Sequence, residues 1–150
     1  MRPPHRDAGC SIGPATPDDL AAIAALLTTD RLPAEGLAAH VDTCLVARDG
    51  DVIVGAAAVE VYGPAGLLRS VVVAAAYRRA GLGRRLTTAA LELARHHRVR
   101  IIFLLARTAA EFFPILGFTL VRRGDVELAV RQSAAGGDHD DAVVMQLVLD

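Results

Sequence analysis

The sequence contains no lysine, and arginine supplies all 16 of its basic residues. There are 17 acidic residues, so the formal net charge is -1 and the chain has no overall attraction to nucleic acid. No apolar run approaches the roughly 20 residues that a membrane-spanning helix needs. The opening stretch Met-Arg-Pro-Pro-His-Arg-Asp is not followed by the apolar segment of a secretory signal. These absences argue against nucleic acid, a membrane and export.

Cysteine is also scarce. Cys10 and Cys44 are the only two, and neither lies in a CxxC or Cys/His spacing that would hold zinc. Cys44 begins a short apolar run, where a free thiol behaves as a small buried hydrophobe. We therefore expect no metal site and a protein of the reducing cytoplasm.

The rest of the composition indicates a single folded domain. The chain has 150 residues, of which 53% are hydrophobic and 22% charged, and this is enough apolar surface for one core. Residues 1–10 are expected to form a flexible tail and residues 11–150 one domain, without internal repeats.

Hydrophobic periodicity and turn residues predict a mixture of strands and helices. Thr16-Pro17-Asp18-Asp19 combines an N-cap, a proline at the first helical position and an acid three residues after the cap, which is typical of a helix start. Asp49-Gly50 between two apolar runs predicts a hairpin. Strands are predicted over 11–15, 45–48, 52–62, 67–73, 99–106, 118–121 and 142–149. Helices are predicted over 16–29, over 35–41, from about Gly81 onward, over 108–117 and over 126–131.

The arginines are unevenly distributed. Eight of the 16 lie between Arg78 and Arg107, a window whose only acidic residue is Glu92. This local excess of positive charge in a nearly neutral chain indicates an anionic ligand. The alternative is a solvated helix face that carries the charge without a partner.

The most informative segment follows the Val-rich strand that ends at Val73. A short loop containing the pattern Arg78-x-x-Gly81-x-Gly83 opens the long helix. Helix N-termini have unpaired N–H groups and a positive dipole end, and glycines let an anion approach the backbone closely. The pattern lacks Gly-Lys-Ser/Thr and does not fit GxGxxG. It therefore predicts a pyrophosphate site of another type.

On this pattern the chain resembles the GNAT-fold N-acetyltransferases, over nearly all of residues 11–150. Within that family it is most similar to the small acetyltransferases of arsenic-resistance operons, through its segments 32–37, 60–63, 66–71, 112–118 and 142–145. The resemblance implies an α/β (α+β) fold with a mixed, mostly antiparallel central sheet of six to seven strands and about four flanking helices. It also implies acetyl-CoA as cosubstrate.

The resemblance assigns roles to individual residues. Strand residues would pair with the pantetheine arm, loop amides would surround the pyrophosphate, and the helix from Phe112 would lie near the thioester. The implied cofactor-binding residues are Val71, Val72, Val73, Arg78, Arg79, Ala80, Gly81, Leu82, Gly83, Arg84, Phe112 and Phe113.

Three positions depart from the family pattern. Phe113 replaces the tyrosine that many members use as general acid, as it also does in the arsenic-resistance subgroup. Ala106 ends the fifth predicted strand where a polar residue is common. The segment 136–141 replaces the subgroup's Cys-Pro. The general acid is therefore without a candidate, although a thiolate of low basicity can leave without one.

Candidate residues for the acceptor lie on the third and fourth strands. Glu60 is the candidate base, acting through water, or else a solvent-facing strand residue. Arg69 and Ser70 are candidate acceptor-binding residues, because consecutive strand residues point to opposite faces unless a bulge intervenes. Arginine suits a carboxylate, phosphinate or arsinate, but Arg69 could instead pair with Glu60 across the sheet. Glu35 is a candidate for the rim of the same site.

Together these features predict acetylation of a small, anionic, amino-acid-like amine, with arsenic- and phosphorus-containing amino acids among the candidates. An acetyltransferase acting on protein N-termini or side chains, and a non-catalytic CoA-binding sensor, are the alternatives. A homodimer is considered for the assembly.

Overall fold

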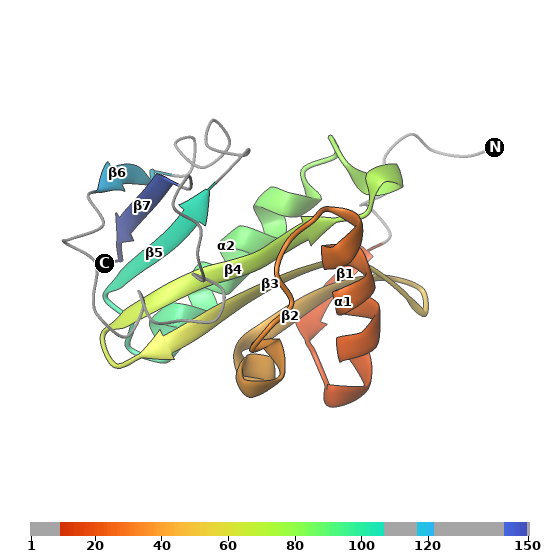
Figure 1. Ribbon diagram of the computed structural model, residues 1–150, viewed down its shortest axis with the longest axis horizontal. Helices are drawn as coiled ribbons and strands as arrows, with labels where there is room; N and C mark the ends of the chain where they lie inside the picture. Colours follow the sequence, from red (N-terminus) through yellow and green to blue (C-terminus); the bar gives the residue numbers. More distant parts are fainter. Residues whose placement is uncertain (1–9, 107–116, 122–142, 150) are drawn as a thin grey trace.

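The computed structural model describes residues 10–106, 117–121 and 143–149, which are coloured in Figure 1. These residues form a seven-stranded sheet of order β1-β2-β3-β4-β5-β7-β6, with two α-helices and three short 3-10 helices. The strands are β1 (Cys10–Pro14), β2 (Cys44–Asp49), β3 (Val52–Tyr62), β4 (Ala65–Val73), β5 (Ile101–Ala106), β6 (Thr119–Val121) and β7 (Val143–Val148). The helices are α1 (Leu20–Thr29), α2 (Leu82–His96), η2 (Pro17–Asp19), η3 (Leu37–Thr43) and η4 (Ala75–Tyr77).

The sheet is antiparallel except between β4 and β5. A parallel pair requires a crossover connection, and α2 provides it. The expected class, a mixed and mostly antiparallel sheet of six to seven strands with flanking helices, is confirmed. The helices predicted over 108–117 and 126–131 lie outside the described residues.

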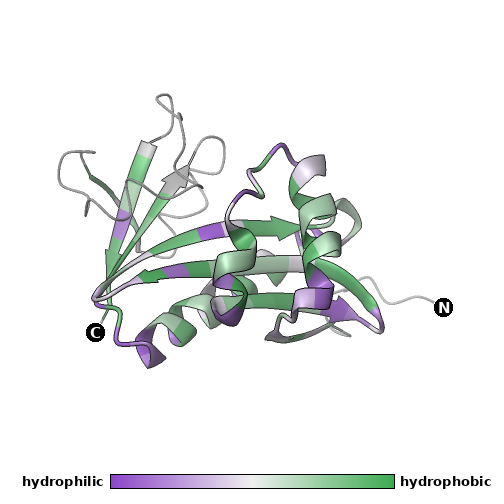
Figure 2. Ribbon diagram, turned by 60° about the horizontal axis from the view of Figure 1, so that its bottom comes forward, coloured by the Kyte–Doolittle hydropathy of each residue, from purple (hydrophilic) through white to green (hydrophobic). Residues whose placement is uncertain are grey.

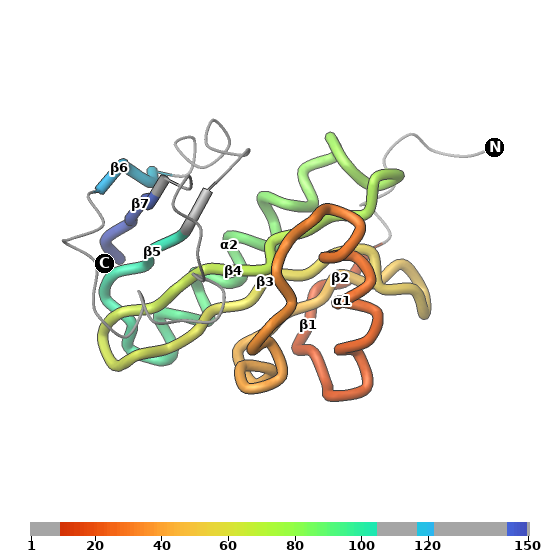
Figure 3. The backbone as a smooth tube through the Cα atoms, viewed as in Figure 1, coloured from red at the N-terminus to blue at the C-terminus, as the bar shows by residue number. Residues whose placement is uncertain are grey.

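The hairpin of β3 and β4 is the centre of the molecule, as Figure 3 shows. β3 follows the predicted range 52–62 without change. Its middle is buried on both faces, which its small residues allow. A Cβ added at Gly55 would lie 2.8 Å from Leu86 Cδ1, so this glycine allows α2 to pack closely against β3.

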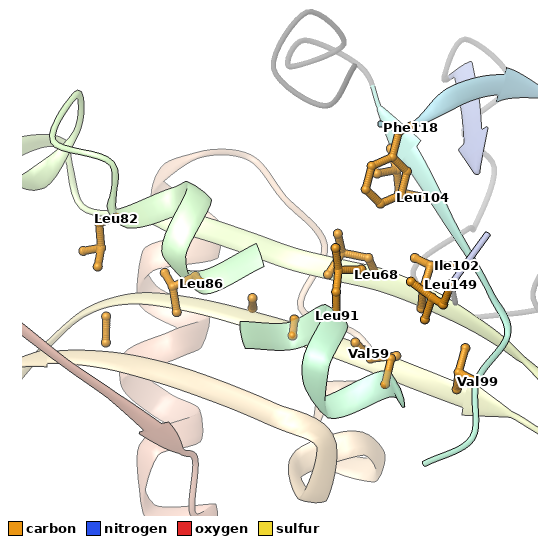
Figure 4. Close-up of a cluster of buried hydrophobic side chains, with 14 of the residues drawn as sticks. Val59, Leu68, Leu82, Leu86, Leu91, Val99, Ile102, Leu104, Phe118 and Leu149 are labelled. Atoms are coloured by element: carbon orange, nitrogen blue, oxygen red, sulfur yellow. The ribbon is translucent and has the colours of Figure 1, made fainter. Parts of the chain in front are cut away.

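Apolar side chains fill both faces of the sheet. α2 packs on one face, where Leu82 and Leu86 are at most 1% exposed (Figure 4). α1 covers the other face with Ile23 and Leu27, which are fully buried. Hydrophobic residues accordingly dominate the central strands in Figure 2. The sheet is therefore held between two apolar layers, and polar groups buried within them need partners.

Asp19 fixes the start of α1. Its carboxylate accepts hydrogen bonds from the backbone N–H of Thr16 at 2.8 Å, from the Thr16 hydroxyl at 3.2 Å and from Arg48 Nη2 at 2.6 Å. These contacts, that of Arg48 foremost, hold the pKa of Asp19 below its ordinary value. The predicted helix start at Thr16 is confirmed, with a capping box between Thr16 and Asp19, although its first turn is the 3-10 helix η2.

Two local predictions need correction. Cys10, expected in the flexible tail, is the first residue of β1, where it pairs with Asp49 and is buried. The helix expected over 35–41 is instead η3, which begins later and has a kink at His40. Gly36 precedes η3 with φ of 80°, a left-handed conformation that a helix cannot pass through, so the helix begins only after this residue.

Candidate active site

The loop between β4 and α2, residues 74–81, brings the end of the strand to the start of the helix. Arg79 and Gly81 have φ values of 65° and 89°, and Gly81 is the N-cap of α2. Glycine adopts such a conformation without steric cost. The predicted order of strand, loop and helix is confirmed. The unpaired N–H groups of the first turn of α2 and the positive end of its dipole thus lie beside the end of β4, where they suit a phosphate group.

The backbone conformation at position 83 does not require a glycine. Gly83 lies in the first turn of α2 and is not among the residues with positive φ. A Cβ added there would lie 3.6 Å from Val73 Cγ2, which is an ordinary contact. The fold would therefore accept a side chain at this position. Because residue 83 has no side chain, the backbone of the helix N-terminus stays open. This fits the approach of an anionic cosubstrate.

Two consecutive side chains fasten this loop to the rest of the fold. The Tyr77 hydroxyl donates a hydrogen bond to Asp49 at the end of β2. Arg78 donates from Nε to the Val73 carbonyl at 2.9 Å, and from Nη2 to both carboxylate oxygens of Asp30 at 2.7 and 2.8 Å. The loop is therefore tied to a hairpin turn and to the end of α1.

The strands β4 and β5 part well before β4 reaches the loop (Figure 1). Their pairing is limited to Ala65–Leu67 opposite Ile101–Phe103, although β4 continues to Val73 and β5 to Ala106. Beyond Leu67, β4 stays paired with β3 on its other side. The edge of β4 that faces away from β3 is thus suited to an extended ligand that adds to the sheet like a strand.

A β-bulge in β4 directly follows Arg69. Arg69 pairs with Ala58 and Val72 with Ala56, so Ser70 and Val71 together lie opposite Ala57. Ser70 accordingly has φ of 59°. The two candidate side chains differ in burial: Arg69 points toward Glu60 and is 6% exposed, whereas Ser70 is half-buried.

Arg69 and Glu60 form a buried ion pair across β3 and β4. Arg69 Nη1 lies 2.8 Å from Glu60 Oε2, and the two side chains are 3% and 1% exposed. Arg69 also donates from Nε to the Ser70 hydroxyl at 3.0 Å and from Nη2 to the Pro33 carbonyl at 3.2 Å. Of the two alternatives for Arg69, pairing with Glu60 is therefore the contact that the structure contains. A buried charge without a partner would be strongly unfavourable.

Tyr62 and His40 join this pair, although no sequence pattern singled them out as site residues. The Tyr62 hydroxyl donates to Glu60 Oε1, and His40 Nε2 lies 3.7 Å from the same oxygen. The two rings contact each other edge to face. We call Glu60, Arg69, Ser70, Tyr62 and His40 the Glu60 cluster. Strand alternation could have indicated Tyr62, two residues after Glu60. His40 comes from η3, and its placement depends on tertiary packing.

Cys44 lies near the Glu60 cluster but is not a reactive thiol. Burial raises the pKa of Cys44 to about 11, while the charge of Arg69 acts in the opposite direction. The residue is 1% exposed. It is therefore protonated at neutral pH, and a protonated thiol is a poor nucleophile.

The remaining predicted site residues divide into three groups. The strand and loop residues from Val71 to Arg84 continue directly from the Glu60 cluster along the chain. Glu35 is exposed, two residues after Pro33. Phe112, Phe113 and the segment 136–141 lie outside the described residues.

A parted sheet edge together with a helix start that suits an anion fits a CoA-dependent acyltransferase. Residues 40–120, more than half of the chain, match the family described as acetyltransferase (GNAT) domain. The chain therefore belongs to the GNAT acetyltransferases, enzymes that use acetyl-CoA as acetyl donor. The expected enzyme class and cosubstrate are confirmed at this level.

Solved structures share the fold. N-acetylglutamate synthase from Neisseria gonorrhoeae, complexed with coenzyme A and N-acetyl-glutamate, matches with a TM-score of 0.82 and 21% identity over 94% of this chain and 35% of that chain. Rv2747 from Mycobacterium tuberculosis, in complex with CoA, matches with a TM-score of 0.78 and 23% identity over 93% of this chain and 99% of that chain. An acetyltransferase from Streptococcus agalactiae matches with a TM-score of 0.75 and 16% identity over 94% of this chain and 99% of that chain.

At these identities the likeness shows the fold alone. The chain spans about a third of the length of the N-acetylglutamate synthase that it matches. A comparison with curated protein sequences gives no match.

Two absences hold for the described ranges 10–106, 117–121 and 143–149. No helix in them combines the length and the apolarity needed to cross a membrane. No group of three or more His, Cys, Asp or Glu side chains in these ranges could hold a metal ion.

Proposed function

We propose that the protein acetylates the amine of a small, amino-acid-like acceptor that carries an anionic group. The observation that supports this most directly is the layout of β4. Its residues Arg69 and Ser70 belong to the Glu60 cluster, and only 71–73 separate them from the loop that opens α2. Donor and acceptor sites would thus be neighbours along one strand, as acetyl transfer requires.

On the donor side, we assign the pyrophosphate to the backbone N–H groups at the start of α2, from Gly81 to Arg84. Arg79 and Arg84 are exposed and would meet the phosphate charge. Val71 and Val73 would offer backbone groups to the pantetheine arm along the parted edge of β4. Acetyl-CoA supplies the acetyl group as an activated thioester, and the residues of this chain orient it.

On the acceptor side, we assign the anionic group to Arg69 and Ser70. A guanidinium has more N–H donors than the three contacts with Glu60, Ser70 and Pro33 use. Ser70 is partly exposed at the bulge and has a hydroxyl proton to donate. Glu60 fixes the guanidinium in place, and Glu35 would lie at the rim.

The acceptor amine must lose a proton before it can attack. Glu60, predicted as the base acting through water, accepts hydrogen bonds from Arg69 and Tyr62. These donors hold the carboxylate in place, and its second role would be to take up the proton through water. His40 lies beside the same carboxylate and is more exposed, at 23% of its side chain. We therefore propose that the proton of the acceptor amine leaves by way of Glu60 and His40.

The finer identity of the acceptor rests on resemblance. The similarity to the acetyltransferases of arsenic-resistance operons makes amino acids with an arsenic or phosphorus acid group the first candidates. Cytoplasmic location and a homodimer remain predictions.

The experiment is release of free thiol from acetyl-CoA with a panel of amines. The panel contains ordinary amino acids, phosphinic and arsinic amino acids, and short peptides with free N-termini. We expect turnover with one of the small anionic amines and an N-acetylated product by mass spectrometry. Turnover only with peptides would favour the protein acetyltransferase, and CoA binding without turnover on any amine would favour the sensor.

A further inference from the structure

Asp30 is an acidic residue at the C-terminal end of α1, where a helix disfavours negative charge. It is the C-cap of α1, where the carbonyl ends make the helix terminus negative, so a carboxylate there is repelled. Its location is nevertheless well defined. The backbone N–H of Asp30 donates to the carbonyls of Leu26 and Leu27, and the N–H groups of Arg31 and Leu32 also bond back to the last turn.

The helix that presents Asp30 is firmly attached to the sheet. Ile23 and Leu27 of α1 are fully buried against the face that β3 and β4 expose to it. The carboxylate of Asp30 therefore projects from a fixed point near the end of β4.

Arg78 connects this fixed point to the cofactor loop. Its guanidinium bonds both oxygens of Asp30 and, through Nε, the carbonyl of Val73, the last residue of β4. Within the loop, Arg78 lies three residues before Gly81, the N-cap of α2. Of the two side chains, that of Asp30 is 29% exposed and that of Arg78 is 47% exposed. One guanidinium thus joins α1, β4 and the loop.

We propose that Asp30 is a positioning residue for acetyl-CoA: it holds Arg78 so that the loop keeps the N–H groups of α2 directed at the phosphates. Arg78 is then a brace for the loop and not a phosphate ligand. This inference rests on the acetyl-CoA assignment and adds a residue from α1 to it. The chain that follows Asp30 continues to Pro33, which accepts a hydrogen bond from Arg69 of the Glu60 cluster (Figure 3).

The sign of one mutational effect separates this role from simple electrostatics. Removing a negative charge near the loop should strengthen the binding of an anionic cosubstrate if only charge matters. If Asp30 positions the loop, Asp30→Asn should weaken it, because the brace loses its charge-assisted contacts.

The experiment is calorimetric titration of the full chain with CoA alone. We expect Asp30→Asn to raise the Kd for CoA by about three- to fivefold, the upper part of the range of an exposed ion pair. Asp30→Glu keeps the charge and should recover most of the affinity. The matched control is Glu92→Gln on α2, which breaks the exposed pair between Glu92 and Arg95, also 2.8 Å long. It should leave the Kd within about twofold of wild type.

A second pair of variants excludes a purely structural effect. Arg78→Gln should weaken CoA binding to the extent that Asp30→Asn does, and the double variant should add little more, because the two residues act as one unit. The Tm of Asp30→Asn should match that of Glu92→Gln. An unchanged or lower Kd in Asp30→Asn, or additive losses in the double variant, would overturn the proposal. Failure of wild type to bind CoA would instead count against the donor site itself.

Discussion

The side chains of Arg69 and Glu60 are joined at 2.8 Å across β3 and β4, and both are almost completely buried. The pair brings two opposite charges into an otherwise apolar sheet, where each depends on the other. It also holds the guanidinium between Ser70 and the carbonyl of Pro33. Arg69 therefore has a structural partner in addition to the acceptor role that we propose.

The first prediction follows from that dependence. Arg69→Ala would remove the guanidinium that bonds the buried carboxylate of Glu60 at 2.8 Å, at a cost of about 3–5 kcal/mol in the free energy of unfolding. Arg69→Lys keeps the charge but not the planar fork, so it should lose less. Urea unfolding of both variants tests this. Equal stability of Arg69→Ala and wild type would show that the ion pair does not form.

The second prediction concerns the coupling between the two charges. Glu60→Gln and Arg69→Gln should each destabilise the protein, and the double variant should be more stable than the sum of the two losses implies. The exposed pair of Glu92 and Arg95 supplies the control, with a coupling of about 0.5 kcal/mol or less. Additive effects at the buried pair would contradict the strong coupling that its burial implies.

The third prediction separates the fold from the donor site at one residue. Gly83→Ala should raise the stability of α2 by about 0.5–1 kcal/mol, because alanine is the better helix former and its Cβ meets only an ordinary contact with Val73. The same Cβ should weaken acetyl-CoA binding, since it would occupy the side from which the backbone is approached. Thermal unfolding and calorimetric titration measure the two effects. If Gly83→Ala raised both the Tm and the affinity for acetyl-CoA, this would show that no ligand approaches the backbone at residue 83.

The fourth prediction is a pH dependence. The pKa of Asp19 is lowered from its ordinary value of 3.8, chiefly by Arg48. The folded chain therefore keeps Asp19 ionised where the unfolded chain takes up a proton. The resulting stability is present above the ordinary pKa and is lost as the pH falls below it.

Asp19→Asn removes this contribution. Between about pH 5 and pH 2, the variant should lose less stability than wild type does. Asp18→Asn, at the exposed neighbouring carboxyl, is the control and should follow wild type. Denaturant unfolding at several pH values measures the slopes, and an identical slope for Asp19→Asn and wild type would contradict the assignment.

Local sequence rules predicted the segments whose structure is determined locally. Asp49-Gly50 predicted the hairpin because its turn chemistry is specific, and hydrophobic periodicity predicted a long helix from about Gly81, which is the N-cap of α2. The helix expected over 35–41 shows the limit of these rules. Gly36 adopts a positive φ there, and nothing in the residues that follow reveals it.

The site was predictable in part for the same reason. Glu60, Arg69 and Ser70 could be named because they interrupt apolar strands, and the loop because of its glycines. Alternation left open which of Arg69 and Ser70 is buried, and it does not predict the bulge that follows Arg69. Asp30 and His40 come from other elements. Their contacts with Arg78 and Glu60 arise from how α1 and η3 pack on the sheet, so no short pattern encodes them.

The most direct test of the central claim is the kcat/KM for a matched pair of acceptors, the best amino acid of the panel and its carboxamide. The two are compared at equal concentrations of neutral amine and saturating acetyl-CoA, in wild type and in Arg69→Lys. We predict that wild type prefers the acid by about ten- to a hundredfold, the value of a charge-assisted contact. Arg69→Lys should narrow that preference while binding acetyl-CoA as wild type does. Equal kcat/KM for acid and amide in wild type would contradict an anionic acceptor held by Arg69.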